Sequence, residues 1–399
     1  MAMSLEPVDW SSYAAAWPAR CDHALVALGT RLLVFGGVAK GRWALQDVWC
    51  SEDLGRSWRC SCQVAPWTAR SGHGAAPAKP GAASEEAALL VGGVGKAGPT
   101  RDVWRSNATG SSWTRVLAAA EWPARYGHSL LVGDGLFLLG GVGVGRFLND
   151  VWRSDDEGET WRHVCDAAFG PRAAAAAVVA SERLIVAGGR GEDRCFDDLW
   201  VSQDGGLCWS ELHQGIRPPP HSGACLLVFG QRLLLLGGFD GQCHHGTIWS
   251  AATLDATNST AHAVTWARHS APWPPRYCHR AVLLEPLVVL TGGHGASGSF
   301  QDTWTNPRLE LLRAQVQRLT LLGRPLGRLG ITREIWDNGV VPYLLPEVAL
   351  KAAAALLVRL RLYCLPGASC GGFLSARPPG SVILTAGIST IQRHCASAR

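Results

Sequence analysis

A short apolar run that ends in two glycines recurs six times along the chain. The runs end at Gly37, Gly93, Gly141, Gly189, Gly238 and Gly293, so successive glycine pairs lie 48 to 56 residues apart. Apolar runs of this length, bounded by turn residues, predict buried β-strands. A period of about 50 residues is the length of one four-stranded blade, so six units predict a six-bladed β-propeller.

Tryptophans follow the glycine pairs at regular spacing. The first one in each unit is Trp49, Trp104, Trp152, Trp200, Trp249 or Trp304, and in five units it closes an Asp-x-Trp triplet that begins at Asp47, Asp102, Asp150, Asp198 or Asp302. A second tryptophan comes nine residues later in four units, at Trp58, Trp113, Trp161 and Trp209, and Trp266 is displaced by an insertion. This spacing predicts two strands joined by a tight turn.

The turn between the two tryptophans has its own pattern. The segment from Ser154 to Trp161 offers the Asp156 carboxylate to nearby N–H groups and a glycine for a positive φ. It resembles the Asp-box, a structural hairpin of several propellers, and residues 51–58 and 202–209 repeat it. The unit that begins at Ser106 has Ala108 where the aspartate belongs, so we interpret it as a degraded copy. The resemblance indicates a fold device and carries little information on function.

Each unit opens with an arginine, usually followed three residues later by a histidine. The pairs are Arg20 with His23, Arg70 with His73, Arg125 with His128, and Arg276 with His279; Arg172 lacks the histidine, and Arg217 has His221 one residue late. An Arg-x-Gly-His start, an apolar strand, a Gly-Gly pair and a later aromatic pair resemble the kelch repeat. The resemblance spans Trp10 to Trp304 and implies an all-β kelch-type propeller that binds partner peptides.

The ends of the repeat predict how the ring closes. The sixth unit has no second tryptophan, whereas Trp10 precedes Arg20 much as Trp58 precedes Arg70. Residues 8–13 are therefore predicted to be the last strand of blade six, which removes the open edges of the ring. This places the propeller in residues 8–305.

The rest of the chain predicts a small α-helical extension over residues 306–365 and a poorly ordered tail over residues 366–399. Apolar residues at three- and four-residue spacing, Leu309, Leu312, Val316 and Leu319, favour a helix. The extension loosely resembles an F-box around Glu334 and Tyr343. We favour a helical cap on the propeller, and the alternative is an adaptor that makes the protein a substrate receptor of a ubiquitin ligase.

Composition limits the class of partner and the chemistry. A net charge of +5, spread over 399 residues, gives no basic patch for nucleic acid, and no apolar run is long enough to span a membrane. We expect a cytoplasmic protein with reduced thiols, since its 13 cysteines are odd in number and mostly isolated. Neither Cys60-Ser-Cys62 nor Cys243-His244-His245 has a second ligand pair at zinc spacing, so no metal and no cofactor are predicted.

Up-and-down topology puts the blade-to-blade loops and the loops after Gly-Gly on one face, and the Asp-box turns on the other. The partner-binding candidates on the first face are Arg20, Arg70, Arg125, Tyr126, Arg172, Arg190, Phe239, Arg276, Tyr277 and His294. Their arginines suit an acidic or phosphorylated partner. Alternatively, the repeated arginines and histidines hold the blades together, which we favour for that set, and the non-repeated residues give specificity.

Two enzyme classes with related propellers are weighed against binding. A sialidase-like site needs an arginine triad and a tyrosine with a glutamate, and a galactose-oxidase-like copper site needs two tyrosines, two histidines and a cysteine. The chain has five tyrosines, with little glutamate near Tyr13, Tyr126 and Tyr277, and Tyr277-Cys278-His279 alternate in facing along a strand. We therefore predict no catalytic residues and a protein-interaction scaffold, with a carbohydrate-active enzyme as a minor alternative.

Overall fold

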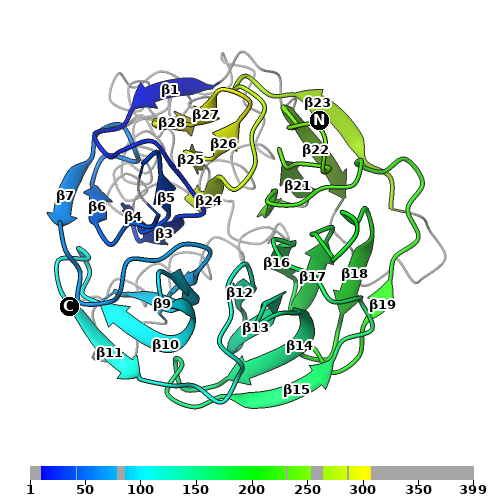
Figure 1. Cartoon of the computed structure of the whole chain (residues 1–399). Helices are drawn as coiled ribbons and strands as arrows, with labels where there is room; N and C mark the ends of the chain where they lie inside the picture. The colour runs from blue at the N-terminus through cyan, green and yellow to red at the C-terminus, as the bar shows by residue number, and fades with distance from the viewer. Residues whose placement is uncertain are drawn as a thin grey trace, which may run out of the picture. The chain divides into compact units, whose positions relative to one another are not determined.

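The computed structural model describes residues 10–41, 43–78, 86–230, 232–252, 264–284 and 287–306. Within these ranges every regular element is a β-strand, and six antiparallel four-stranded sheets surround a central axis, as Figure 1 shows. The prediction of a six-bladed propeller is confirmed.

The blades follow one another along the chain, each running from its innermost to its outermost strand. Blade one contains β3 (Ala24–Leu28), β4 (Arg31–Phe35), β6 (Val48–Ser51) and β7 (Arg59–Cys62). Blade two contains β8 (Gly74–Pro77), β9 (Ala88–Gly95), β10 (Gly98–Ser106) and β11 (Trp113–Leu117). Blade three contains β12 (Ser129–Val132), β13 (Leu136–Val142), β14 (Phe147–Ser154) and β15 (Arg162–Asp166). Blade four contains β16 (Ala176–Ala180), β17 (Arg183–Ala187), β18 (Leu199–Ser202) and β19 (Ser210–Glu211). Blade five contains β20 (Cys225–Phe229), β21 (Arg232–Leu236), β22 (Thr247–Ala252) and β23 (Ala267–Ser270).

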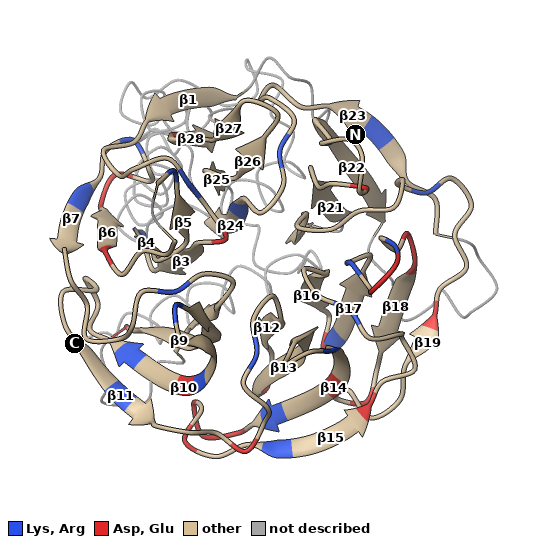
Figure 2. Cartoon of the chain, in the orientation of Figure 1, with Lys and Arg blue, Asp and Glu red and all other residues tan. Residues whose placement is uncertain are grey.

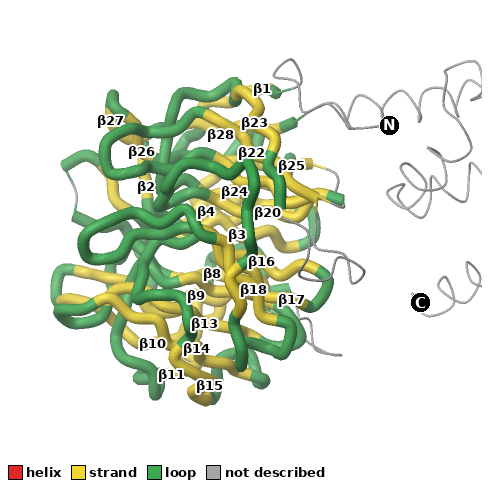
Figure 3. Tube along the Cα trace, turned by 90° about the vertical axis from the view of Figure 1, so that its right-hand side faces the viewer, coloured by secondary structure: helices red, strands yellow, loops and turns green. Residues whose placement is uncertain are grey.

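Blade six is completed by the start of the chain. Its strands are β24 (Arg280–Leu284), β25 (Leu287–Thr291), β28 (Asp302–Thr305) and, as the outer strand, β1 (Ser11–Ala14). Ser11 pairs with Thr305 and Ala14 with Asp302, and the Trp10 ring packs edge-on against Trp273 at 4.7 Å between centroids. The predicted closure is confirmed, with the strand starting at Ser11 instead of Val8. Two short pairs lie outside the six blades: β2 (Arg20–Cys21) pairs with β5 (Val38–Ala39), and β26 (His294–Gly295) pairs with β27 (Gly298–Ser299). Figure 3 shows β2, β26 and β27 at one side of the propeller.

The Gly-Gly pairs are required where neighbouring blades approach. Gly140 and Gly141 have φ angles of 58° and 101°, in the left-handed region that side chains avoid. A Cβ atom on Gly140 would lie 2.8 Å from the Arg172 carbonyl oxygen, and one on Gly141 would lie 2.8 Å from the Tyr126 carbonyl oxygen. Because these glycines have no side chain, the carbonyl groups of Arg172 in the next blade and Tyr126 in the same blade can pack directly against their backbone.

Apolar side chains between adjacent blades form the core. Between blades two and three, Leu89 and Val91 are fully buried in one cluster with Leu138, Trp122 and Trp161. The rings of Trp122 and Trp161 meet edge to face, 6.0 Å apart. The same pairing joins Trp17 to Trp58 and Trp67 to Trp113, so in blades one to three these tryptophans pack the outer strand against the loop that precedes the blade.

The turns between the third and fourth strands are built on side-chain hydrogen bonds. Asp156 accepts hydrogen bonds from the Thr160 backbone N–H and the Ser154 hydroxyl, each at 2.9 Å. In blade two, where Ala108 replaces the aspartate, Asn107 accepts from the Ser111 backbone N–H at 3.0 Å. A neighbouring amide thus supplies the acceptor that Ala108 lacks, and this turn is less degraded than its sequence indicates.

The predicted helical extension over residues 306–365, apart from Asn306, and the tail over residues 366–399 lie outside the described residues. So does the segment that resembles an F-box. No helix among the described residues is long and apolar enough to cross a membrane.

Candidate binding face

The repeated arginines lie inside the blades. Arg125 donates two hydrogen bonds to the two carboxylate oxygens of Asp150, both at 2.6 Å, one to the Gly140 carbonyl at 2.9 Å and one to the Pro123 carbonyl at 3.0 Å. The second Asp150 oxygen also accepts the indole N–H of Trp152 at 2.7 Å. The same two-pronged contact joins Arg20 to Asp47, Arg70 to Asp102, Arg172 to Asp198 and Arg276 to Asp302.

These arginines are closed off from solvent. Arg20, Arg125 and Arg276 are 0% exposed, and Arg70 and Arg172 are at most 2% exposed. Burial raises the pKa of Asp150, but the hydrogen bonds and charge of Arg125 outweigh it, so the pKa lies below its ordinary value. A buried, neutralised guanidinium offers no donor to a partner. The placement favours the alternative in which the repeated arginines hold the blades together.

Blade five departs from this pattern. The carbonyl of His221 accepts the Gly189 N–H at 2.7 Å, as the arginine carbonyls do elsewhere, so His221 and not Arg217 stands at the arginine position. Thr247 stands where the other blades have the aspartate. Arg217 is instead exposed and pairs with Asp197 at 3.1 Å. Blade five is therefore built without the arginine–aspartate pair.

The repeated histidines pack behind the glycine pairs. His23, His73, His128 and His279 are at most 7% exposed, and burial lowers the pKa of each, to about 3 for His128 and His279. The Cε1 atom of His73 would lie 2.5 Å from a Cβ on Gly36, so the imidazole ring fills the space that this glycine leaves. Ala175 and Ala224 take the histidine position in blades four and five. The burial of these histidines favours the same framework role for them.

A closed ring of backbone hydrogen bonds surrounds the axis. In each blade the residue two after the arginine position has a positive φ and donates its N–H to the same residue of the preceding blade. The members of this backbone ring are Asp22, Gly72, Gly127, Ala174, Gly223 and Cys278, and the six N···O distances are 2.7 to 3.0 Å. The ring is complete because Asp22 donates to Cys278, which joins the first blade to the last.

Two residues from each blade lie beside this ring and form the candidate binding face. The residue after each arginine position pairs with the residue after each glycine pair; the pairs are Cys21 with Val38, Ser71 with Val94, Tyr126 with Val142, Ala173 with Arg190, Ser222 with Phe239, and Tyr277 with His294. The post-glycine residue is valine in blades one to three and arginine, phenylalanine or histidine in blades four to six. At the post-glycine positions, the half of the face formed by blades one to three therefore carries only valines, and the half formed by blades four to six carries charged and aromatic side chains.

Aromatic rings lie together on the half of the face that blades four to six form. Phe239, His244 and Tyr277 lie 4.9 to 5.3 Å apart between centroids, and His294 lies 5.9 Å from Tyr277. All four are partly exposed. Three of them were predicted from the sequence, but His244 was not, although its place in the loop after a glycine pair was a signal. The structure brings Phe239, Tyr277 and His294 together, while Tyr126 lies two blades before Phe239.

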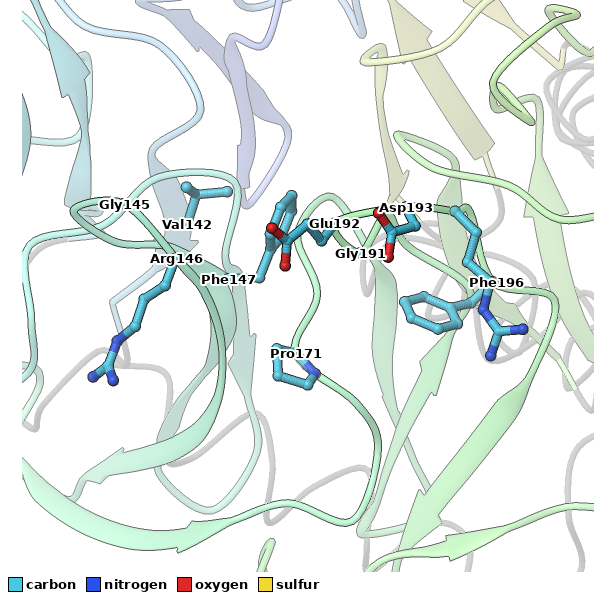
Figure 4. A pocket seen from close by; sticks show the side chains of 10 residues that line it. Val142, Gly145, Arg146, Phe147, Pro171, Gly191, Glu192, Asp193 and Phe196 are labelled. Atoms are coloured by element: carbon cyan, nitrogen blue, oxygen red, sulfur yellow. The ribbon is translucent and has the colours of Figure 1, made fainter.

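A pocket of about 1520 Å³ occupies the face, lined by Tyr126, Arg190, Phe239 and Tyr277 above the ring residues Asp22 and Gly127. Residues 192–196 of the loop after Gly191 also line it, and they were not predicted from the sequence. A side groove of about 530 Å³ continues between this loop and Phe147, and Figure 4 shows Glu192 and Phe147 lying close together there. Exposed charges of both signs line the pocket, including Arg190, Glu192, Asp193 and Arg194. Figure 2 shows this mixture along the loops of blade four.

The Tyr277 side chain presents a protonated hydroxyl on the face. Burial raises the pKa of Tyr277 to about 12, so its hydroxyl is protonated at neutral pH. Among the described residues, no three His, Cys, Asp or Glu side chains are grouped as metal ligands.

A family model for the KLHDC2/KLHL20/DRC7 Kelch-repeats domain matches residues 3–170. No curated protein matches the chain. The matched region covers blades one to three, and blades four and six have the same arginine, glycine pair and Asp-x-Trp contacts beyond it.

Proposed function

Because this chain is a kelch-repeat β-propeller, we propose that it is a protein-interaction scaffold whose binding face takes one segment of a partner. Kelch propeller domains typically bind protein partners. The observation that carries the proposal is the arrangement on the half of the face formed by blades four to six: Arg190, Phe239 and Tyr277 line one wide pocket, and the rings of His244 and His294 lie beside Tyr277.

The floor of the pocket supports a segment that lies across the face. The backbone ring closes around the axis just beneath the pocket, with all six of its N–H groups bonded within the ring. A partner chain therefore finds side chains on the walls and no free backbone donors in the floor. Large aromatic side chains and arginine are the residue types that contribute most at protein interfaces.

The partner's chemistry follows from the walls. Arg190 is exposed and forms no ion pair with any described residue, so it is available to a carboxylate or phosphate. The aromatic cluster beside it offers apolar surface. We propose a segment with an acidic group next to an apolar side chain. Since Glu192 and Asp193 share the pocket, a uniformly acidic partner is disfavoured.

The test is affinity purification followed by titration of the captured partner against single variants. Arg190→Ala and Tyr126→Ala should weaken binding about tenfold, the loss of a moderate hot spot, and leave thermal stability nearly unchanged. Arg125→Ala should lower both. Glu159→Ala, in an exposed turn of the opposite face, is the matched control. Normal binding by Arg190→Ala, with loss of binding by turn variants such as Glu159→Ala, would mean that the partner uses the other face.

The alternative of a ubiquitin-ligase receptor makes a different prediction. It requires residues 307–399 for recovery of ligase subunits, whereas the scaffold needs only the propeller for its partner. Purification with and without these residues separates the two functions.

A further inference from the structure

A second cavity lies on the other side of the backbone ring. This central channel has a volume of about 580 Å³ and is lined by residues of all six innermost strands, most of them alanine, valine and leucine. Asp22, Gly127, Ala174 and Cys278 of the backbone ring line both this channel and the pocket above, so the ring lies between them.

Arg280 is the one arginine or lysine among the residues that line this channel. The first residue of the innermost strand is Ala24, Gly74, Ser129, Ala176 and Cys225 in blades one to five, and Arg280 in blade six. Figure 2 shows the blue segment of β24, and none of the other five innermost strands contains lysine or arginine. The blade architecture does not need an arginine here, because five blades form without one.

Arg280 lacks the partner that every framework arginine has. It donates a hydrogen bond to the adjacent His279 carbonyl at 3.2 Å and is hydrogen-bonded to the Cys225 side chain, but no carboxylate of the described residues lies within 4.0 Å of its guanidinium. The carboxylate that lines the channel, Asp22, is hydrogen-bonded to the Cys278 thiol. A guanidinium in apolar surroundings without a counter-ion attracts an anion more strongly than one in water.

Two buried histidines, which belong to blades two and three and not to the blade of Arg280, also line the channel. His73 and His128 line the channel at 2% and 7% exposure. Each lies near a carbonyl of the preceding blade, Phe35 or Val91, but no ring nitrogen reaches good hydrogen-bond geometry with the described residues. The ring nitrogens of His279, which does not line the channel, also have no partner among the described residues, so this feature belongs to the packing of the repeated histidines.

We propose that the central channel is a binding site for a small oxyanion of the phosphate or sulfate class, held by the guanidinium of Arg280. The planar guanidinium donates two parallel hydrogen bonds to such an ion. Asp22 weakens the site by repulsion and keeps out larger polyanions. This site is independent of the proposed partner face, which lies across the backbone ring.

The test is a phosphate titration of the full chain at constant ionic strength, followed by thermal unfolding and by ³¹P line broadening. Phosphate should raise the melting temperature, because a ligand that binds the folded state stabilises it. Arg280→Ala should bind phosphate at least about tenfold more weakly, the typical loss for a charged hydrogen bond. It should fold, since Ala24 and Ala176 occupy this position in blades one and four. Asp22→Asn should strengthen binding.

The matched control is Arg268→Ala, which removes an exposed arginine from the outer strand of blade five. It should keep the response of the unmodified chain, as should Arg190→Ala on the partner face. The proposal fails if phosphate has no effect on the unmodified chain, or if Arg280→Ala responds to phosphate as Arg268→Ala does.

Discussion

Removing the Arg125–Asp150 pair tests whether the repeated arginines belong to the framework. Arg125 is fully buried, and its guanidinium makes four hydrogen bonds, two of them to Asp150. Arg125→Ala leaves the Asp150 carboxylate buried without its counter-ion. Breaking a buried pair on one side typically costs about 3–5 kcal/mol. At roughly 2 °C per kcal/mol for a domain of this size, the melting temperature should fall by about 6–10 °C.

Blade five provides the matched double variant. It forms with His221 and Thr247 at these two positions, so Arg125→His with Asp150→Thr reproduces a combination that the fold already accepts. The double variant should be more stable than the sum of the two single variants implies, by about 0.5–3 kcal/mol for residues in direct contact. Urea unfolding followed by tryptophan fluorescence measures the three free energies of unfolding.

Arg217→Ala is the control, because the Arg217–Asp197 pair is exposed and such pairs contribute at most about 1 kcal/mol. If Arg125→Ala lowers the free energy of unfolding no more than Arg217→Ala does, or if the two single losses simply add in the double variant, the framework role is refuted.

Two further predictions concern stability. Burial, and after it the charge of Arg125, lowers the pKa of His128 from 6.5 to about 3 in the folded chain. The unfolded chain therefore binds a proton at this histidine more tightly than the folded chain does. The free energy of unfolding should fall by about 1.4 kcal/mol per pH unit as the pH drops below 6.5. Urea unfolding at pH 7 and pH 5.5 should show this loss, and His128→Ala, which copies Ala175 of blade four, should make it smaller; an unchanged pH dependence in the variant would contradict the assignment. Deleting residues 1–14 removes β1 and the Trp10–Trp273 contact, so the melting temperature of the whole propeller should fall, and an unchanged value would mean that β1 does not close the ring.

The repeat alone determined the blade count and the closure. Glycine pairs such as Gly140 and Gly141 are readable in the sequence because only glycine tolerates both a positive φ and a backbone contact from the next blade. Trp10 indicated its strand because it precedes Arg20 much as Trp58 precedes Arg70. These signals are local, and local backbone geometry repeats in every blade.

The pairing of each repeated arginine with an aspartate became clear only from the tertiary structure, although the sequence contained a signal for it. Five units have both the arginine and the Asp-x-Trp triplet, and blade five lacks both at the aligned positions, which indicates a pair. The arginine and aspartate are more than twenty residues apart, so only the packing of the blade decides that their side chains meet in the interior.

The backbone ring, the aromatic cluster and the channel around Arg280 were decided by tertiary structure alone. Each combines residues from different blades, such as Asp22 with Cys278 in the ring and Phe239 with Tyr277 in the cluster. Closure of the ring brings the first and last blades together. The spacing of residues within one repeat does not predict which residues of the other repeats will lie beside it. The sequence therefore determined the blades, whereas the sites depend on how six blades converge on one axis.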